Sequence, residues 1–147
     1  MMPDRTPTAA GSDHPTEARS FHAISLAASL TVKDVDASLA WYRDVVGFTL
    51  AQRHERNGTL VAVSLEAGDV RILLGQDDGK KGWDRPKGEG FSLQLTTSQS
   101  VDEIAARIKS HGVSLDSEPM DMPWGARAFR FHDPDGFKLV ITSPRPG

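Results

Sequence analysis

Apolar and polar residues alternate in the first half of the chain as they do in β-strands. Residues 23–32 are apolar and end in an alternation with Leu30 and Val32 on one face and Ser29 and Thr31 on the other. Three further strand candidates follow at residues 49–54, 59–66 and 70–74. The short connections between them, RNG and AGD, are typical of hairpin turns. The first half therefore predicts four strands.

A helical pattern lies between the first and second of these strands. In DVDASLAWYRDVVGF, apolar side chains recur every three or four residues and form one stripe, made of Val35, Leu39, Tyr42 and Val46. Asp34 or Asp36 is suited to cap the start of this helix, and Gly47 is suited to stop it. The predicted order of elements is β-α-β-β-β.

The second half repeats this order. FSLQLTT alternates like a strand, and Ser100 with Glu103 forms a capping box for a helix that ends at Gly112. Strand candidates follow at residues 113–117, 126–132 and 137–142. VDASLAWYRDVVG matches VDEIAARIKSHG, and GDVRILL matches DGFKLVI, at an offset of about 66 residues. The chain is therefore expected to hold two tandem βαβββ modules.

The fold class predicted from this repeat is α+β, with the two modules curling a mixed sheet around a cleft. Module one is expected at about residues 22–76 and module two at about residues 90–143. Together they form one domain, residues 21–147, preceded by a disordered tail at residues 1–20. The linker, about residues 77–89, is rich in glycine and charge and is expected to be exposed.

The alternation also predicts which side chains face each way. One set packs under the helices: Leu30, Val32, Ile72, Leu74, Leu93, Leu95, Phe129, Phe131, Leu139 and Ile141. The opposite set faces the cleft: Ala27, Ser29, Thr31, Arg71, Leu73, Ser92, Gln94, Thr96, Arg130, Lys138, Val140 and Thr142.

Composition narrows the classes of function. The chain has 147 residues and a net charge of −3, with no basic stripe, which argues against a nucleic-acid partner. It contains no cysteine, which excludes disulfides, thiolate nucleophiles and cysteine-bound zinc. No apolar run approaches the length of a membrane span, and the first residues lack the apolar block of a secretory signal. A cytoplasmic protein is expected.

Two stretches, LTVKDVDASLAWYRDVVGF and FRFHDPDGFKLVI, resemble the signature regions of the vicinal oxygen chelate superfamily. This superfamily includes glyoxalase I, extradiol dioxygenases, fosfomycin-resistance enzymes and bleomycin-resistance proteins. The resemblance covers about residues 22–143. It implies paired βαβββ modules around an open cleft, usually in a dimer, so a homodimer is expected.

The resemblance also implies where a metal would bind. Members that use a divalent ion hold it with four His and Glu side chains, two from each module. In this chain the corresponding positions are Ala27, Leu73, Ser92 and Val140. None of these supplies the imidazole or carboxylate that such an ion needs. No metal and no other cofactor is therefore expected, although a relocated site involving His22, His54 or His132 stays open.

PWGARAFRFHDPDGF resembles the pattern of the bleomycin-resistance proteins, which bind a drug in a groove. The predicted function is metal-free binding of a small molecule, with sequestration of a drug or natural product. The alternatives are an enzyme of the same superfamily (a lyase, an isomerase or a dioxygenase-like protein) with a non-standard site, and an interaction module that uses the central loop. No catalytic residue is predicted.

The predicted ligand-binding residues divide by chemistry. Trp124 and Trp83 offer aromatic faces, although Trp124 is also suited to cover the core edge and Trp83 to anchor the loop or a dimer contact. The cations of the predicted cleft are Arg71, Arg130 and Lys138. The uncharged polar residues are Ser29, Thr31, Ser92 and Gln94, and the apolar ones are Leu73 and Val140.

Overall fold

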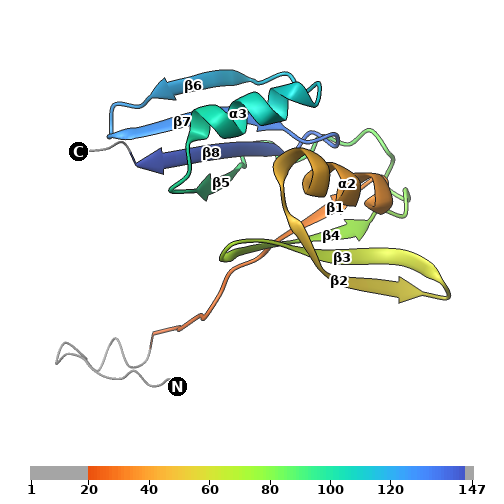
Figure 1. Ribbon diagram of the computed structural model, residues 1–147. Coiled ribbons are helices and arrows are strands. Elements are labelled where there is room, and N and C mark those ends of the chain that lie inside the picture. Colours follow the sequence, from red (N-terminus) through yellow and green to blue (C-terminus); the bar gives the residue numbers. More distant parts are fainter. Residues whose placement is uncertain (1–19, 145–147) are drawn as a thin grey trace.

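The computed structural model describes residues 20–144 (Figure 1). Module one contains β1 (Ala28–Val32), α2 (Val35–Trp41), the π-helical turn η1 (Tyr42–Val46), β2 (Thr49–Arg56), β3 (Thr59–Ala67) and β4 (Val70–Gln76). Its strands form sheet one in the order β1-β4-β3-β2, with β1 parallel to β4. The predicted tail lies outside the described residues except for Ser20.

Module two contains β5 (Leu93–Thr96), α3 (Val101–Ser110), β6 (Ser117–Asp121), β7 (Ala126–His132) and β8 (Lys138–Pro144). Its strands form sheet two in the order β5-β8-β7-β6, and β5 is parallel to β8. Each module therefore pairs its first strand with its last. This repeat confirms the predicted α+β fold of two tandem βαβββ modules.

The helix ends follow the capping residues that the sequence predicts. The carboxylate of Asp34 accepts a hydrogen bond from the backbone N–H of Ala37 at 3.1 Å. At the other end, Gly47 has a φ of 105°, which a residue with a side chain rarely adopts. In module two, the hydroxyl of Ser100 accepts from the N–H of Glu103 at 3.2 Å. Neither α2 nor α3 has the length and apolar character needed to cross a bilayer.

Two predicted strands are placed differently by the structure. The first strand begins at Ala28, and the apolar residues before it do not join a sheet. The strand predicted at residues 113–117 is instead β6, Ser117–Asp121. This strand contains Pro119, which has no N–H to donate. A proline fits here because β6 is at the sheet edge, with a register shift between Ser117 and Met120.

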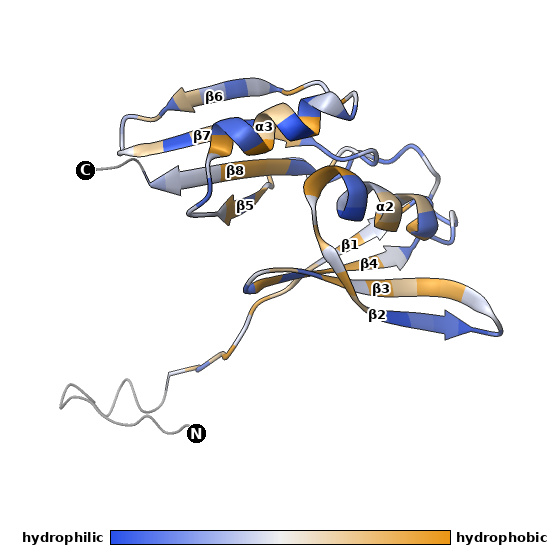
Figure 2. Cartoon of the chain, in the orientation of Figure 1, coloured by the Kyte–Doolittle hydropathy of each residue, from blue (hydrophilic) through white to orange (hydrophobic). Residues whose placement is uncertain are grey.

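The helix-facing sides of both sheets pack into one continuous core, as the alternation predicts. Leu30, Val32, Phe129 and Phe131 are each 2% exposed or less. Leu93 and Leu95, on the edge strand β5, are only partly buried against the same core. Figure 2 shows that β3 is mostly hydrophobic, whereas β2 at the edge of sheet one is mostly hydrophilic.

The turn between β7 and β8 joins the two modules. Asp133 is buried, and its carboxylate accepts hydrogen bonds from the hydroxyl of Tyr42 at 2.7 Å and from the N–H groups of Asp135 at 2.9 Å and Phe137 at 2.8 Å. Burial raises the pKa of Asp133, while the hydroxyl of Tyr42 and the two N–H groups partly oppose that rise. Asp135 also accepts from the N–H of Lys33 in module one.

Charged side chains of the linker pair with one another and with the backbone of module one. Asp77 is buried and accepts hydrogen bonds from the guanidinium of Arg85 and the N–H of Gly79, both at 2.9 Å. The side chain of Lys87 is only 7% exposed and lies 3.6 Å from the carboxylate of Asp77. Its ammonium group donates to the carbonyl of Thr31 and lies over the ring of Phe137. Most of the linker is exposed, as expected, but Asp77 is buried because these charges pair.

Candidate functional site

Each sheet has a second face, here called its open face, on the side opposite to the helices. On sheet one, the strand register brings Ser29 beside Leu73 and Thr31 beside Gly75. Ser29 and Thr31 are exposed, and Leu73 is partly exposed. The predicted residues of module one therefore lie together on one surface, where they offer hydroxyl groups around a single apolar side chain.

Arg71 lies on the same open face but does not carry a free charge. Its register partner in β3 is Glu66, and the guanidinium of Arg71 donates to the Glu66 carboxylate at 2.7 Å. The two charges offset one another, so the predicted positive surface does not extend over this part of sheet one.

The open face of sheet two keeps its positive charges. Val140, in the middle of the sheet, has Gln94 on one side and Arg130 on the other. Lys138 lies opposite His132 in the next row. Arg130 and Lys138 are exposed, and neither forms an ion pair within residues 20–144. Val140 itself is buried, which makes it the floor of this surface.

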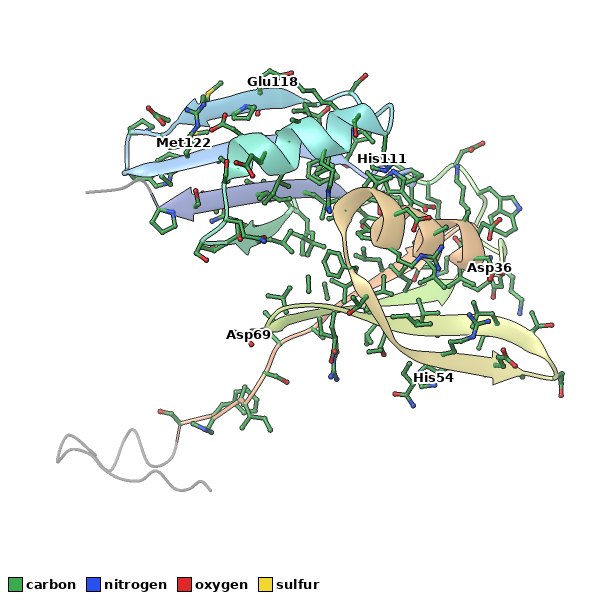
Figure 3. All side chains as sticks on the ribbon, in the orientation of Figure 1. Asp36, His54, Asp69, His111, Glu118 and Met122 are labelled. Atoms are coloured by element: carbon green, nitrogen blue, oxygen red, sulfur yellow. The ribbon has the colours of Figure 1, made fainter. Side chains whose placement is uncertain are left out.

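The four histidines within residues 20–144 do not gather into a site. His132 pairs with Asp116, whose carboxylate lies 3.1 Å from its Nδ1 atom. His54 lies on β2 and His111 follows α3, so these two belong to different modules (Figure 3). His22 precedes β1 and is exposed. In the described part of the chain, no group of three or more His, Asp or Glu side chains is arranged to hold a metal ion.

The two tryptophans of the predicted site lie in connections. Trp124 is 71% exposed, between β6 and β7, so it covers little of the core. Trp83 is 47% exposed in the linker, and its ring lies against the backbone of Gly79. That contact gives Trp83 a role in anchoring the loop. Ser92 is exposed immediately before β5.

A crevice of about 770 Å³ lies between the modules, away from the predicted site. It is bordered by the turn after β3, which includes Asp69 (Figure 3), and by the segment that leads from β5 into α3. Arg107 and Glu103 contribute its charged side chains from α3. Of the residues predicted to face the cleft, Thr96 lines this crevice and the others do not.

Comparison with known proteins assigns the family. The family model described as the Glyoxalase/Bleomycin resistance protein/Dioxygenase superfamily matches residues 14–141. The chain belongs to this superfamily. No curated protein sequence matches the chain.

Several solved structures share the fold of this chain. TnmS3, an antibiotic binding protein from Streptomyces sp. CB03234, is 26% identical, with a TM-score of 0.66 over 84% of this chain and 99% of that one. A superfamily member from Sphaerobacter thermophilus is 26% identical, with a TM-score of 0.67 over 83% of this chain and 98% of that one. TioX from Micromonospora sp. ML1 is 23% identical, with a TM-score of 0.66 over 83% and 99%.

The strand registers show how the four positions that correspond to the superfamily's metal ligands are placed in the two modules. Leu73 is the register partner of Ser29, two residues after Ala27, and Val140 is the register partner of Gln94, two residues after Ser92. The two modules therefore present the same geometry at these positions. Three of the four side chains are hydrocarbon, and the fourth, that of Ser92, carries a hydroxyl. This set does not fit a divalent ion, which needs imidazole or carboxylate donors.

The partners of three charged residues, two on the open faces and one on the helix side of sheet two, were not predicted from the sequence. Glu66 neutralises Arg71, Asp116 binds His132, and Arg127 bridges Asp102 of α3 and Asp121 of β6. The AGD hairpin already contained the signal for the first pair, because its register places residue 66 opposite residue 71. The partners of Arg127 depend on where α3 packs on sheet two, which a single sequence does not reveal.

Proposed function

We propose that this protein binds a small molecule without a metal and sequesters a drug or natural product on the open faces of its sheets. The observation that carries the proposal is the set of side chains at the four metal-ligand positions: Ala27, Leu73, Ser92 and Val140. The fold is intact around them, but the donors that metal-dependent chemistry of the superfamily requires are replaced. The antibiotic-binding neighbour TnmS3, at 26% identity, supports the same class of function.

The open faces have the chemistry of a surface that orients a ligand. Ser29, Thr31, Ser92 and Gln94 are exposed and uncharged, and they donate and accept hydrogen bonds. Trp124 offers a large aromatic face for stacking. Leu73 adds apolar contact area. In this proposal a ligand is held by many moderate contacts, and none of these side chains is a nucleophile paired with a base.

We also propose that the protein acts as a homodimer in the cytoplasm. The segment that leads into β1 carries Phe21, Ile24 and Leu26, which are 92%, 92% and 94% exposed. In a monomer these three large apolar side chains stay in water, and burying them against a partner would release favourable free energy. β1 is an edge strand, so this segment is free to reach a second copy.

Native mass spectrometry of the protein as isolated, combined with elemental analysis, tests both proposals. We expect a mass of two chains, each of 16.0 kDa, and far less than one divalent ion per chain. A stoichiometric divalent metal that survives dialysis would contradict the metal-free proposal, and a monomer at every concentration would contradict the dimer.

A matched pair of variants tests the contribution of the apolar segment. Replacing Phe21, Ile24 and Leu26 by serine is expected to shift the population towards monomer. Met120→Ser removes an exposed apolar side chain elsewhere and is expected to leave the dimer unchanged. A triple variant that dimerises like the wild type would exclude this segment from the interface.

One observation favours a second candidate function, an enzyme with acid–base chemistry. Asp116 orients the imidazole of His132, and Arg130 and Lys138 lie on the same open face. A carboxylate–histidine pair beside cations is an arrangement that suits proton abstraction from a substrate with a negative charge. If a turnover is found, this candidate predicts that His132→Gln abolishes it and that His54→Gln does not.

A further inference from the structure

The cations on the two open faces differ in their pairing. On sheet one, Glu66 binds the guanidinium of Arg71 at 2.7 Å. On the helix side of sheet two, Arg127 is held by Asp102 at 2.9 Å and Asp121 at 3.0 Å. Arg130 and Lys138 have no such partner in residues 20–144. The protein therefore places two unneutralised positive charges on one surface of module two.

The strand register brings these two charges together. Arg130 is opposite Val140 on β8, and Lys138 precedes Val140 by two residues on the same strand. Residues in this diagonal relation lie about 7–8 Å apart on one face, within reach of long side chains. The backbone N–H of Asp116 donates to the carbonyl of Arg130, so the carboxylate of Asp116 lies beside this pair. That carboxylate contacts the imidazole of His132 instead of either cation. A single small anion can therefore contact both cations.

The side chains around the pair suit an oxyanion. The guanidinium of Arg130 presents a planar fork that matches the two oxygens of a carboxylate, sulfonate or phosphate group. The ammonium of Lys138 adds a point charge, and Gln94, across Val140 from Arg130, adds an amide donor. Sheet one offers hydroxyl and apolar groups instead, with Arg71 neutralised. An anionic group therefore meets unpaired cations on sheet two, whereas the cation on sheet one is already paired.

We propose that the ligand of this protein is anionic, and that Arg130 and Lys138 bind its carboxylate, sulfonate or phosphate group on the open face of sheet two. This inference rests on the proposed function, because it names the class of small molecule that the same surface takes. It adds a specificity that the superfamily's fold alone does not provide.

Two fluorescent probes with the same aromatic skeleton test the inference. 8-Anilino-1-naphthalenesulfonate carries a sulfonate, and N-phenyl-1-naphthylamine lacks it. We expect the wild type to bind the sulfonate probe about tenfold more tightly at low salt, since each charge-assisted contact adds to the affinity. The advantage is expected to shrink as salt screens the exposed charges.

Variants then assign the preference to named residues. The double variant Arg130→Gln/Lys138→Gln is expected to lose about tenfold in affinity for the sulfonate probe and to bind the uncharged probe as the wild type does. Arg71→Gln, which removes a cation that is already paired, is expected to change the affinity for the sulfonate probe less than about twofold. Unchanged affinity for the sulfonate probe in the double variant would overturn the inference.

The same titrations separate failure of the inference from failure of the proposed function. Trp124→Ala is expected to weaken both probes, because it removes an aromatic contact and no charge. If Trp124→Ala weakens both probes but the sulfonate gives no advantage, the open faces bind small molecules and only the anionic class is wrong. If neither probe responds to any of these variants, but both respond to Glu103→Gln in the crevice, the proposed function on the open faces is also wrong.

Discussion

Replacing Asp133 by alanine is expected to lower the free energy of unfolding by about 4 kcal/mol, because one buried donor and two partly buried donors lose their acceptor at once. These donors are the hydroxyl of Tyr42 and the N–H groups of Asp135 and Phe137. The Tyr42 contact links the two modules, so the damage extends beyond the turn itself. Equilibrium unfolding in urea measures the loss.

Asp133→Asn is the matched control for charge. The amide oxygen still accepts from the two N–H groups, and the amide nitrogen donates to the hydroxyl of Tyr42. The asparagine carries no charge to bury, so we expect a loss of about 1 kcal/mol or less. If Asp133→Asn is as damaging as Asp133→Ala, the carboxylate charge is essential and this account of the turn is wrong.

The same pair of proteins predicts a pH dependence. Burial raises the pKa of Asp133 in the folded state above its ordinary value of 3.8. The folded state therefore binds the proton more tightly than the unfolded state, and the stability that Asp133 contributes falls as the pH rises through the folded pKa. The difference in unfolding free energy between wild type and Asp133→Asn should shift in favour of asparagine as the pH rises from the unfolded pKa of Asp133 through its raised folded pKa. A difference that is flat with pH would contradict the raised pKa.

Phe131→Ala is expected to cost about 4 kcal/mol, since it leaves a large cavity in the shared core. The ring of Phe131 is fully buried, stacks on Phe129 at 5.6 Å between ring centroids and lies 6.1 Å from the ring of Trp41 in module one. The variant therefore weakens both the core of sheet two and its contact with α2. Thermal and urea unfolding measure the effect.

Phe91 supplies the control for Phe131. It has the same side chain, but it is 52% exposed, two residues before β5. Phe91→Ala is expected to change the unfolding free energy by no more than about 0.5 kcal/mol. Equal losses at the two positions would show that the shared core contributes less than its burial indicates.

The repeat and the alternation made most of the fold predictable. Leu30 and Val32 face the core and Ser29 and Thr31 do not, because the side chains of a strand alternate whatever the tertiary structure is. Asp34, Gly47 and Ser100 mark helix ends because their local chemistry favours those positions. These signals are local, so a single sequence carries them.

The elements that were misplaced depend on contacts between distant parts of the chain. Val113 and Leu115 pack against the core without forming a strand, while Pro119 lies in one because its strand is at an edge. From the sequence, Asp77 and Lys87 are predicted to be exposed charges of a linker, because nothing local indicates that they pair. For the candidate site, the sequence predicted which residues share the open faces. It did not predict that Arg71 is neutralised and that Arg130 and Lys138 are not.

Because the two modules share one continuous core, a single module would not cover all of its own apolar surface. A chain with only one βαβββ unit would leave apolar surface around its helix uncovered, because the other unit supplies part of that cover. Such a chain would need to associate with a second copy at a concentration that favours the pair. Tandem repetition tethers the second copy to the first, so that its effective concentration no longer depends on how much protein is present. The contacts of Lys87 with Asp77 and with the carbonyl of Thr31 hold the linker against module one and so shorten the effective length of the tether.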